Sequence, residues 1–284
     1  MHLRRILTGL AFLPIFLLGI FWRHGDWVTA AAAAFAFVYA REELYILLEA
    51  KQRRESMWWQ NLCGALFFVV CVYHDFSTSL IAALRLAAVF FFFWGSCLIT
   101  LSHTVKGSRN EFAAHGLTMI YVLAPLACLV YLRGIENGPN YLFFLLAVTC
   151  LTDIGAFYGG TWLGRHPLAP VISPKKTWEG SICGTVFAAA AILGIAAYQS
   201  AKYGQTLWLS GPHRYMEILI VAVMMSVIAQ IGDLCESAIK RDAGVKDSGR
   251  SITGHGGFLD MMDSLLWAAP AMLVYVKFFV TAAE

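Results

Sequence analysis

Long apolar runs recur from one end of the sequence to the other, and they constrain the fold more than any other feature. Hydrophobic residues make up 59% of the 284 residues, and charged residues only 14%. A helix needs roughly 20 apolar residues to cross a bilayer, and its backbone polar groups must bond within the segment. The runs are continuous rather than alternating, so they do not fit the strands of a β-barrel. The pattern predicts an all-α polytopic integral membrane protein.

We expect about nine transmembrane helices, with eight as the alternative because several runs are short or carry charges. The first run lacks a small-residue cleavage site before Arg23, so we expect an uncleaved helix rather than a signal peptide. The nine expected spans are 6–22, 27–49, 57–73, 78–101, 113–132, 141–164, 180–198, 215–239 and 262–280.

The Lys and Arg residues indicate which side of the membrane each loop occupies. If the N-terminus is cytoplasmic, 14 of the 21 Lys and Arg residues fall in cytoplasmic segments and 4 in outer segments. Cytoplasmic loops of membrane proteins carry an excess of these residues, so we expect this orientation. It makes 165–179 and 240–260 cytoplasmic loops. The seven cysteines form no CxxC pair, which favours small buried side chains over zinc ligands or disulfides.

Residues that carry chemistry gather in the second half of the chain. We therefore divide the sequence into N-terminal transmembrane helices (1–140), whose role the sequence does not assign, and a C-terminal catalytic region (141–284). The charged triplet Arg41-Glu42-Glu43 lies in the second span. We interpret it as a helix that surfaces early, with charges that pair or reach toward water.

Asp153 stands in an otherwise apolar run that also contains several glycines. Small residues at helical spacing let two helices approach closely, which accounts for the glycines alone. A charged carboxylate at membrane depth needs a partner, so we expect Asp153 to face a polar cavity.

The cytoplasmic segment after this span places two lysines beside the start of a helix. Ser173 and Thr177 are suited to cap a helix that begins near Gly180, and Lys175 and Lys176 lie between them. A helix N-terminus with adjacent lysines is an anion site. The alternative is a capped helix flanked by ordinary cytoplasmic lysines.

Gln230, Asp233, Ser237 and Lys240 recur at three- and four-residue steps, so they share one face of the eighth span. Glu236 and Lys240 also have the spacing of a favourable ion pair, and a simple salt bridge is the alternative to a functional site. The mixture of acids and bases at this membrane boundary suggests a metal ion and a polyanion bound together.

The ninth span opens with Asp260 and Asp263, three residues apart and thus on one helical face. Two acids on one face repel each other unless a cation lies between them. Oxygen-only ligands suit Mg²⁺, which is usually shared with substrate phosphates. The preceding Gly256 and Gly257 permit a tight turn. His255 fits either a proton carrier or a phosphate hydrogen-bond donor.

The spacing of these residues resembles a known signature. The pattern Ser237-x-x-Lys240-Arg241-x₄-Lys246-Asp247-x-Gly249-x₅-His255-Gly256-Gly257-x-x-Asp260-x-x-Asp263 closely resembles that of the phosphatidate cytidylyltransferase (CDP-diacylglycerol synthase) family. The segments 173–180, 230–237 and 153–160 resemble further blocks of that family in the same order. The first half of the chain resembles the family only as a set of hydrophobic spans.

The resemblance implies a nucleotidyltransferase of phospholipid biosynthesis, which joins CTP and phosphatidate to give CDP-diacylglycerol and pyrophosphate. It implies Mg²⁺, with a second cation as an alternative, and Asp233, Asp260, Asp263 and Asp247 as metal ligands. The catalytic residues would be Asp233, Asp260, Lys240 and His255. The substrate-binding residues would be Lys175, Lys176, Ser173, Thr177, Ser237, Arg241, Lys246 and Asp153.

The resemblance also implies a homodimer in a bacterial inner membrane, with the active site facing the cytoplasm and no nucleic-acid partner. Two positions depart from the family pattern: Met261 replaces the usual Arg, and Thr253 replaces Pro, Gly or Ser. The missing cation leaves open a divergent enzyme for another lipid phosphate or a weakened paralogue. A CTP-dependent lipid-alcohol kinase is a separate alternative, because it would need similar residues. An organic-anion transporter is a further alternative, but the sequence lacks the internal repeats common in transporters.

Overall fold

The computed structural model describes residues 18–49, 54–72, 108–204, 214–249 and 256–280, together with Pro14, Thr206 and Trp208. Two compact units divide the chain. Unit 1 comprises Met1–Glu136 and Asp242–Met262, and unit 2 comprises Asn137–Arg241 and Asp263–Glu284. The expected functional division at residue 140 stays a prediction.

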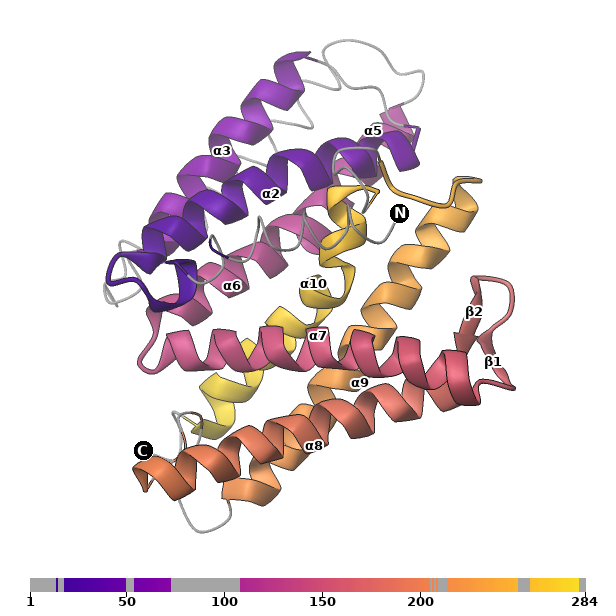
Figure 1. Cartoon of the computed structure of the whole chain (residues 1–284). Helices are drawn as coiled ribbons and strands as arrows, with labels where there is room; N and C mark the ends of the chain where they lie inside the picture. Colours follow the sequence, from indigo (N-terminus) through magenta and orange to yellow (C-terminus); the bar gives the residue numbers. More distant parts are fainter. Residues whose placement is uncertain are drawn as a thin grey trace. The chain divides into compact units, whose positions relative to one another are not determined.

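Unit 1 is a group of packed helices. It contains α2 (Gly25–Leu47), α3 (Arg54–Val72), α5 (Ser108–Leu117), the π-helical η1 (Thr118–Leu123) and α6 (Ala124–Gly134). Helix α2 packs against both α3 and α6 (Figure 1). The buried Arg133 donates to the carbonyls of Gly19 and Trp22 and forms an ion pair with Asp26 at 2.9 Å. The Arg133 guanidinium thus links the end of α6 to the start of α2 and the residues just before it.

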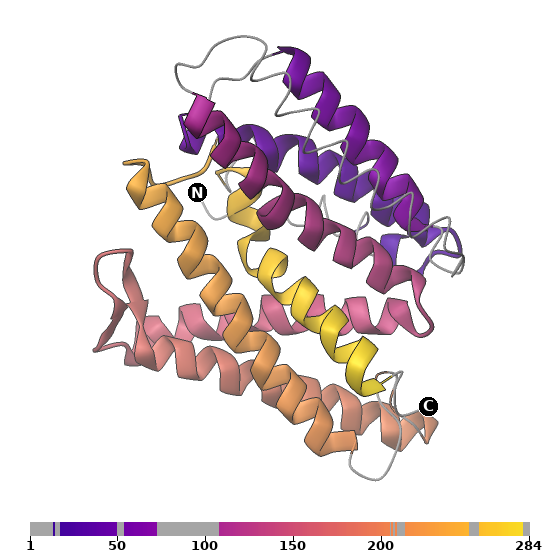
Figure 2. The same ribbon diagram turned by 180° about the vertical axis from the view of Figure 1, so that it is seen from behind.

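Unit 2 is built on a long antiparallel helix pair. Helix α7 (Gly138–Leu163) is joined to α8 (Trp178–Tyr203) by a hairpin of β1 (Pro167–Ala169) and β2 (Ser173–Thr177). Helices α7 and α8 lie side by side along their length in Figures 1 and 2. Helix α9 (Arg214–Asp242) follows, then α10 (Phe258–Tyr275) and the π-helical η2 (Val276–Val280).

Glycines bring the backbones of α7 and α8 together. A Cβ atom added to Gly184 would lie 2.6 Å from the carbonyl oxygen of Thr152, and one added to Gly180 would lie 2.9 Å from that of Ala156. Real Cβ atoms do not approach backbone this closely, so a side chain here would push the helices apart. The glycines expected to allow close packing lie on α7. A Cβ added to one of them, Gly155, would lie 3.0 Å from the Cα atom of Gly184, so their expected role is confirmed for this helix pair.

Among the described residues, five helical segments are long and apolar enough to cross a membrane, and the protein is an integral membrane protein. They confirm the last five expected spans. The span expected at 57–73 corresponds to a shorter apolar helix, Met57–Val72, and the one at 27–49 forms α2. The span at 78–101 lies outside the described residues, as does most of 6–22. The total of nine spans and the orientation stay predictions. The five segments are Asn110–Gly134, Gly138–Leu163, Trp178–Tyr203, Arg214–Asp242 and Phe258–Val280.

The β hairpin is a departure from the all-helical expectation. Ser173 precedes Pro174, and a residue before proline is biased toward extended backbone. The strands pair Pro167 with Thr177 and Ala169 with Ser173. Ser173 therefore lies in β2 and does not cap a helix, whereas Thr177 does cap α8, which begins at Trp178.

We expect Gly184→Ala to lower the melting temperature of the detergent-solubilised protein, because the new methyl group meets backbone of α7. Overpacking of this kind typically costs about 1–3 kcal/mol. Gly194→Ala is the matched control, because a Cβ at Gly194 on the same helix has nothing within 4 Å. That control should be neutral or slightly stabilising, since Ala favours helix over Gly. Equal melting temperatures for the two variants would contradict the packing argument.

Candidate functional site

Hydroxyl groups connect α7, α8 and α9 inside unit 2. Thr152 donates to the hydroxyl of Ser226 at 2.8 Å, and both side chains are fully buried. The Ser226 hydroxyl also lies 3.0 Å from that of Thr185, which accepts a hydrogen bond from Gln230 Nε2 at 3.0 Å. Each of these four side chains thus has a polar partner, which fixes how the face of α9 bearing Gln230 meets α8.

One helical turn beyond Gln230, unit 2 contains a cluster of four carboxylates, which we call the carboxylate cluster. Its members are Asp153, Asp233, Glu236 and Asp263. Asp263 is near enough to the other three to interact with them electrostatically, and Asp153 interacts with Asp233 and Lys176. The cluster draws its members from α7, α9 and α10.

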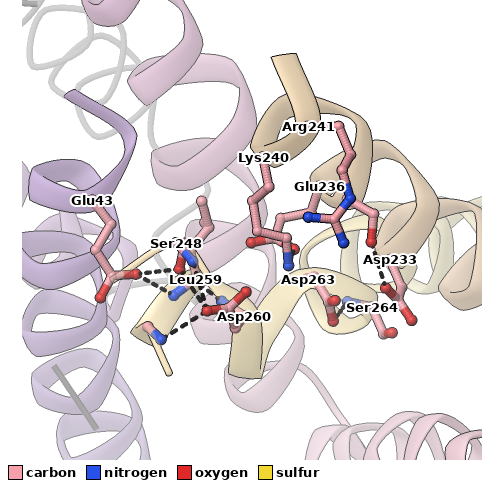
Figure 3. Close-up of polar contacts among 12 residues, drawn as sticks. Glu43, Asp233, Glu236, Lys240, Arg241, Ser248, Leu259, Asp260, Asp263 and Ser264 are labelled. Atoms are coloured by element: carbon pink, nitrogen blue, oxygen red, sulfur yellow. Dashed lines mark hydrogen bonds and ion pairs between the residues drawn. The ribbon is translucent and has the colours of Figure 1, made fainter. Parts of the chain in front are cut away.

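Two lysines pair with the carboxylate cluster. Lys176 in β2 forms an ion pair with Asp233, and Lys240 forms an ion pair with Glu236 one turn earlier on α9. The expected Glu236–Lys240 salt bridge is confirmed. Glu236 is completely buried and the Lys240 side chain is only 9% exposed, so this pair is shielded from water. Figure 3 shows both side chains on α9. The Ser237 hydroxyl donates to Asp233 at 3.3 Å.

The charge balance of the cluster suits a hard cation. Four carboxylates face two ammonium groups, which leaves two negative charges when all four acids are ionised. The ligands offered are oxygens only, as Mg²⁺ prefers. Within the described residues, however, no three His, Cys, Asp or Glu side chains converge closely enough to form a metal centre by themselves. The donor chemistry therefore fits Mg²⁺, although these side chains do not complete its coordination by themselves.

The β hairpin is held onto the start of α8 and the end of α9. Thr177 accepts a hydrogen bond from Gly180 N at 3.2 Å, and Glu179 accepts from the backbone N–H groups of Arg165 and His166. Arg241 donates to the carbonyl of Ile172 at 3.1 Å. Lys175 is exposed on β2. Lys175 and Lys176 were both expected to bind anions. The fold directs only Lys176 of these two toward a carboxylate, that of Asp233.

In unit 1, hydrogen bonds link two described parts of the signature, residues 246–249 and 256–260. Asp260 Oδ2 accepts hydrogen bonds from Gly257 N at 2.7 Å, Ser248 N at 2.8 Å and Ser248 Oγ at 3.0 Å. Gly256 has φ of 90°, and a Cβ there would lie 2.8 Å from the same carboxylate oxygen. Only glycine adopts this turn without strain. Lys246 and Asp247 precede Ser248 and are exposed.

The structure thus brings together Asp153, Lys176, Asp233, Lys240 and Asp263 in unit 2, and it places Asp260 and Asp247 in unit 1. His255 lies outside the described residues. One residue with a prominent role escaped sequence analysis. Glu43 of α2 accepts hydrogen bonds from Ser248, Phe258 and Leu259. The charge of Glu43 in an apolar run was a visible signal, but its partner lies more than 200 positions along the chain.

Comparison with known proteins decides the family. Residues 3–279, nearly the whole chain, match the sequence profile of the cytidylyltransferase family. The chain belongs to this family. The resemblance inferred from the signature is confirmed, and the match includes the N-terminal half, where the sequence pattern alone was weak.

Similar proteins carry the name phosphatidate cytidylyltransferase. One from Brucella suis is 39% identical over 189 residues, which is 66% of this chain and 65% of that protein. One from Staphylococcus haemolyticus is 36% identical over 177 residues, which is 61% of this chain and 64% of that protein. The matched region is thus slightly less than two thirds of the length of these relatives.

We expect Lys240→Met to lower the melting temperature, because it removes the ammonium group that pairs with a fully buried carboxylate. Breaking one side of a buried ion pair typically costs about 3–5 kcal/mol. The double variant Lys240→Met/Glu236→Gln should recover part of this loss, since no charge is then left behind. Thermal unfolding of both single variants and the double variant measures the coupling. Losses that simply add in the double variant would contradict a direct pair.

Proposed function

We propose that the protein is a phosphatidate cytidylyltransferase, which condenses CTP with phosphatidate to give CDP-diacylglycerol and pyrophosphate. The observation that carries this proposal is the carboxylate cluster with its two lysines, in a chain of the cytidylyltransferase family. The names of the relatives point to the same reaction.

In this reaction a phosphate oxygen of phosphatidate attacks the α-phosphorus of CTP. The bond from that phosphorus to the oxygen bridging the α- and β-phosphates breaks, and pyrophosphate leaves with the electron pair. Phosphoryl-type transfer needs chiefly positioning and neutralisation of negative charge. Cations on a rigid scaffold meet this need. Those assigned to the phosphates of CTP or of the lipid are Lys175, Lys176, Lys240, Arg241 and Lys246.

Mg²⁺ is the proposed cofactor, and when bound it would neutralise charge on the triphosphate and on the departing pyrophosphate. Asp233 and Asp263 of the carboxylate cluster would hold it, and Asp260 and Asp247 are the other proposed ligands. The surplus of carboxylates in the cluster favours a second cation as the alternative to a single Mg²⁺. Ser237 donates to Asp233 and so orients one proposed ligand.

The remaining polar residues are assigned to substrate. The Thr177 hydroxyl accepts from Gly180 N, and its own proton is available for a phosphate oxygen. Ser173 on the same strand has the same capacity. Asp153 shapes the field around Asp233, and His255 is assigned as a catalytic proton carrier or phosphate donor.

The proposed location is a bacterial inner membrane with the site facing the cytoplasm. One substrate is a membrane lipid and the other a cytoplasmic nucleotide, so the reaction belongs at that surface. The distribution of Lys and Arg favours the same orientation. A homodimer is proposed as the functional assembly.

The decisive assay uses purified full-length protein in mixed micelles with CTP labelled at the α-phosphate, Mg²⁺ and phosphatidate. We expect the label to enter the lipid while pyrophosphate is released in equal amount. A kinase acting on a lipid alcohol would instead release labelled CDP. Incorporation of the label into a different lipid phosphate, but not into phosphatidate, would identify a divergent substrate. Other lipid phosphates are included in the assay because Met261 replaces a family Arg. Turnover of none of these lipids would overturn the proposal.

We expect Asp233→Asn to reduce turnover on the order of 100-fold or more, because preorganised charge that acts on the reacting phosphates is lost. Glu217→Gln is the matched control, an exposed acid in the first turn of the same helix. It should retain normal activity. Rates measured across a Mg²⁺ titration test the assignment, and full activity in Asp233→Asn would refute it.

A further inference from the structure

The carboxylate of Glu43 is buried at the start of a helix that lies far away in the sequence. Glu43 is only 2% exposed. Oε1 accepts a hydrogen bond from Phe258 N at 2.8 Å, and Oε2 accepts from Leu259 N and Ser248 Oγ, each at 2.8 Å. Figure 3 shows the side chain reaching from α2 toward Ser248 and Leu259. Both carboxylate oxygens are thus used, and all of these groups belong to unit 1.

This arrangement is an N-cap supplied by a different helix. The first N–H groups of a helix lack partners within it, and the helix dipole places partial positive charge at that end. A carboxylate there satisfies two of these groups at once and gains charge-assisted hydrogen bonds. Such bonds offset the cost of burying the charge of Glu43. The first turn of α10 is therefore fixed to α2.

Two glycines of the signature make room for the Glu43 carboxylate. A Cβ at Gly249 would lie 2.7 Å from Oε1 of Glu43, and a Cβ at Gly257 would collide with Ser248 Oγ and Oε2 of Glu43. Any larger residue at either position would displace the carboxylate. The backbone at Gly249 and Gly257 is thus shaped around a side chain from the N-terminal half of the chain.

Ser248 connects Glu43 to Asp260. Its hydroxyl lies 2.8 Å from Glu43 Oε2 and 3.0 Å from Asp260 Oδ2, and its N–H donates to the same Asp260 oxygen. A serine hydroxyl has a single proton, so the two carboxylates share one donor. The direction of Asp260 therefore depends on how Glu43 holds both Ser248 and the backbone of residues 258 and 259.

We propose that Glu43 is a positioning residue of the proposed cytidylyltransferase site. It anchors Ser248 and the first turn of α10, and through them it sets the orientation of the Asp260 carboxylate for Mg²⁺. The inference rests on the proposed function only in the assignment of Asp260 as a metal ligand. It gives the N-terminal helices a role in the chemistry of the C-terminal signature.

The test compares Glu43→Gln with Glu42→Gln in the full-length protein in lipid nanodiscs. Glu42 is the adjacent residue of α2, and its side chain is 38% exposed. In Glu43→Gln, we expect the Mg²⁺ concentration for half-maximal effect to rise about 10–100-fold, as when an outer partner of a metal ligand is lost. Hydrogen–deuterium exchange should also accelerate in the peptide covering residues 256–262. Glu42→Gln should change neither quantity.

Ser248→Ala keeps both carboxylates and removes only the shared hydroxyl. It replaces Glu43→Gln as the test variant if Glu43→Gln does not fold. It should shift the Mg²⁺ requirement in the same direction. The Mg²⁺ titration is read twice, as turnover and as a rise in melting temperature. The rise in melting temperature needs no catalysis. Inactive wild-type protein would therefore count against the proposed function and not against the positioning role of Glu43. A lower melting temperature with unchanged Mg²⁺ requirement, or unchanged exchange at 256–262, would overturn the positioning role.

Discussion

A charged side chain in an apolar interior is stable only where other groups of the protein replace the water that it loses. Glu43, Glu236 and Arg133 are all buried in this protein, and each meets that condition differently. Glu43 binds the N–H groups of a helix start, Glu236 pairs with Lys240, and Arg133 binds two carbonyls and Asp26. Since each charge has a defined set of partners, the helix ends that provide them are held in one arrangement. The polar parts of both units follow from this constraint.

Close helix packing places the charges of unit 2. The glycines between α7 and α8 let their backbones nearly touch, which sets the hairpin that joins them. That hairpin brings Lys176 to Asp233 of α9. The hydroxyls of Thr152, Thr185 and Ser226 link α7, α8 and α9 to one another. A site of opposite charges can thus be built on helix ends without a separate soluble domain. The proposed reaction, between a membrane lipid and a soluble nucleotide, needs such a location.

The charged triplet of α2 shows where sequence reasoning failed and why. The interpretation that these charges pair was confirmed for Arg41 and Glu42, which lie 3.4 Å apart. The idea that they reach toward water was wrong for Arg41 and Glu43, which are 1% and 2% exposed. Arg41 donates to the carbonyl of Met57 on α3, and Glu43 caps α10. Helical periodicity describes neighbours three or four positions away and carries no information on a partner 215 positions away.

The sequence by itself determined the class of the protein, five of its spans and the residues of the signature, because apolar run length and residue spacing are local properties. The same local logic identified the Glu236–Lys240 pair and the Thr177 cap. It could not foresee the hairpin that turns Lys176 toward Asp233, or the electrostatic interaction between Asp153 and Asp263, because these depend on how separate helices pack. Only the tertiary structure decided that Glu43 completes the start of α10. Buried charges choose partners by proximity in space, and packing rather than chain order sets that proximity.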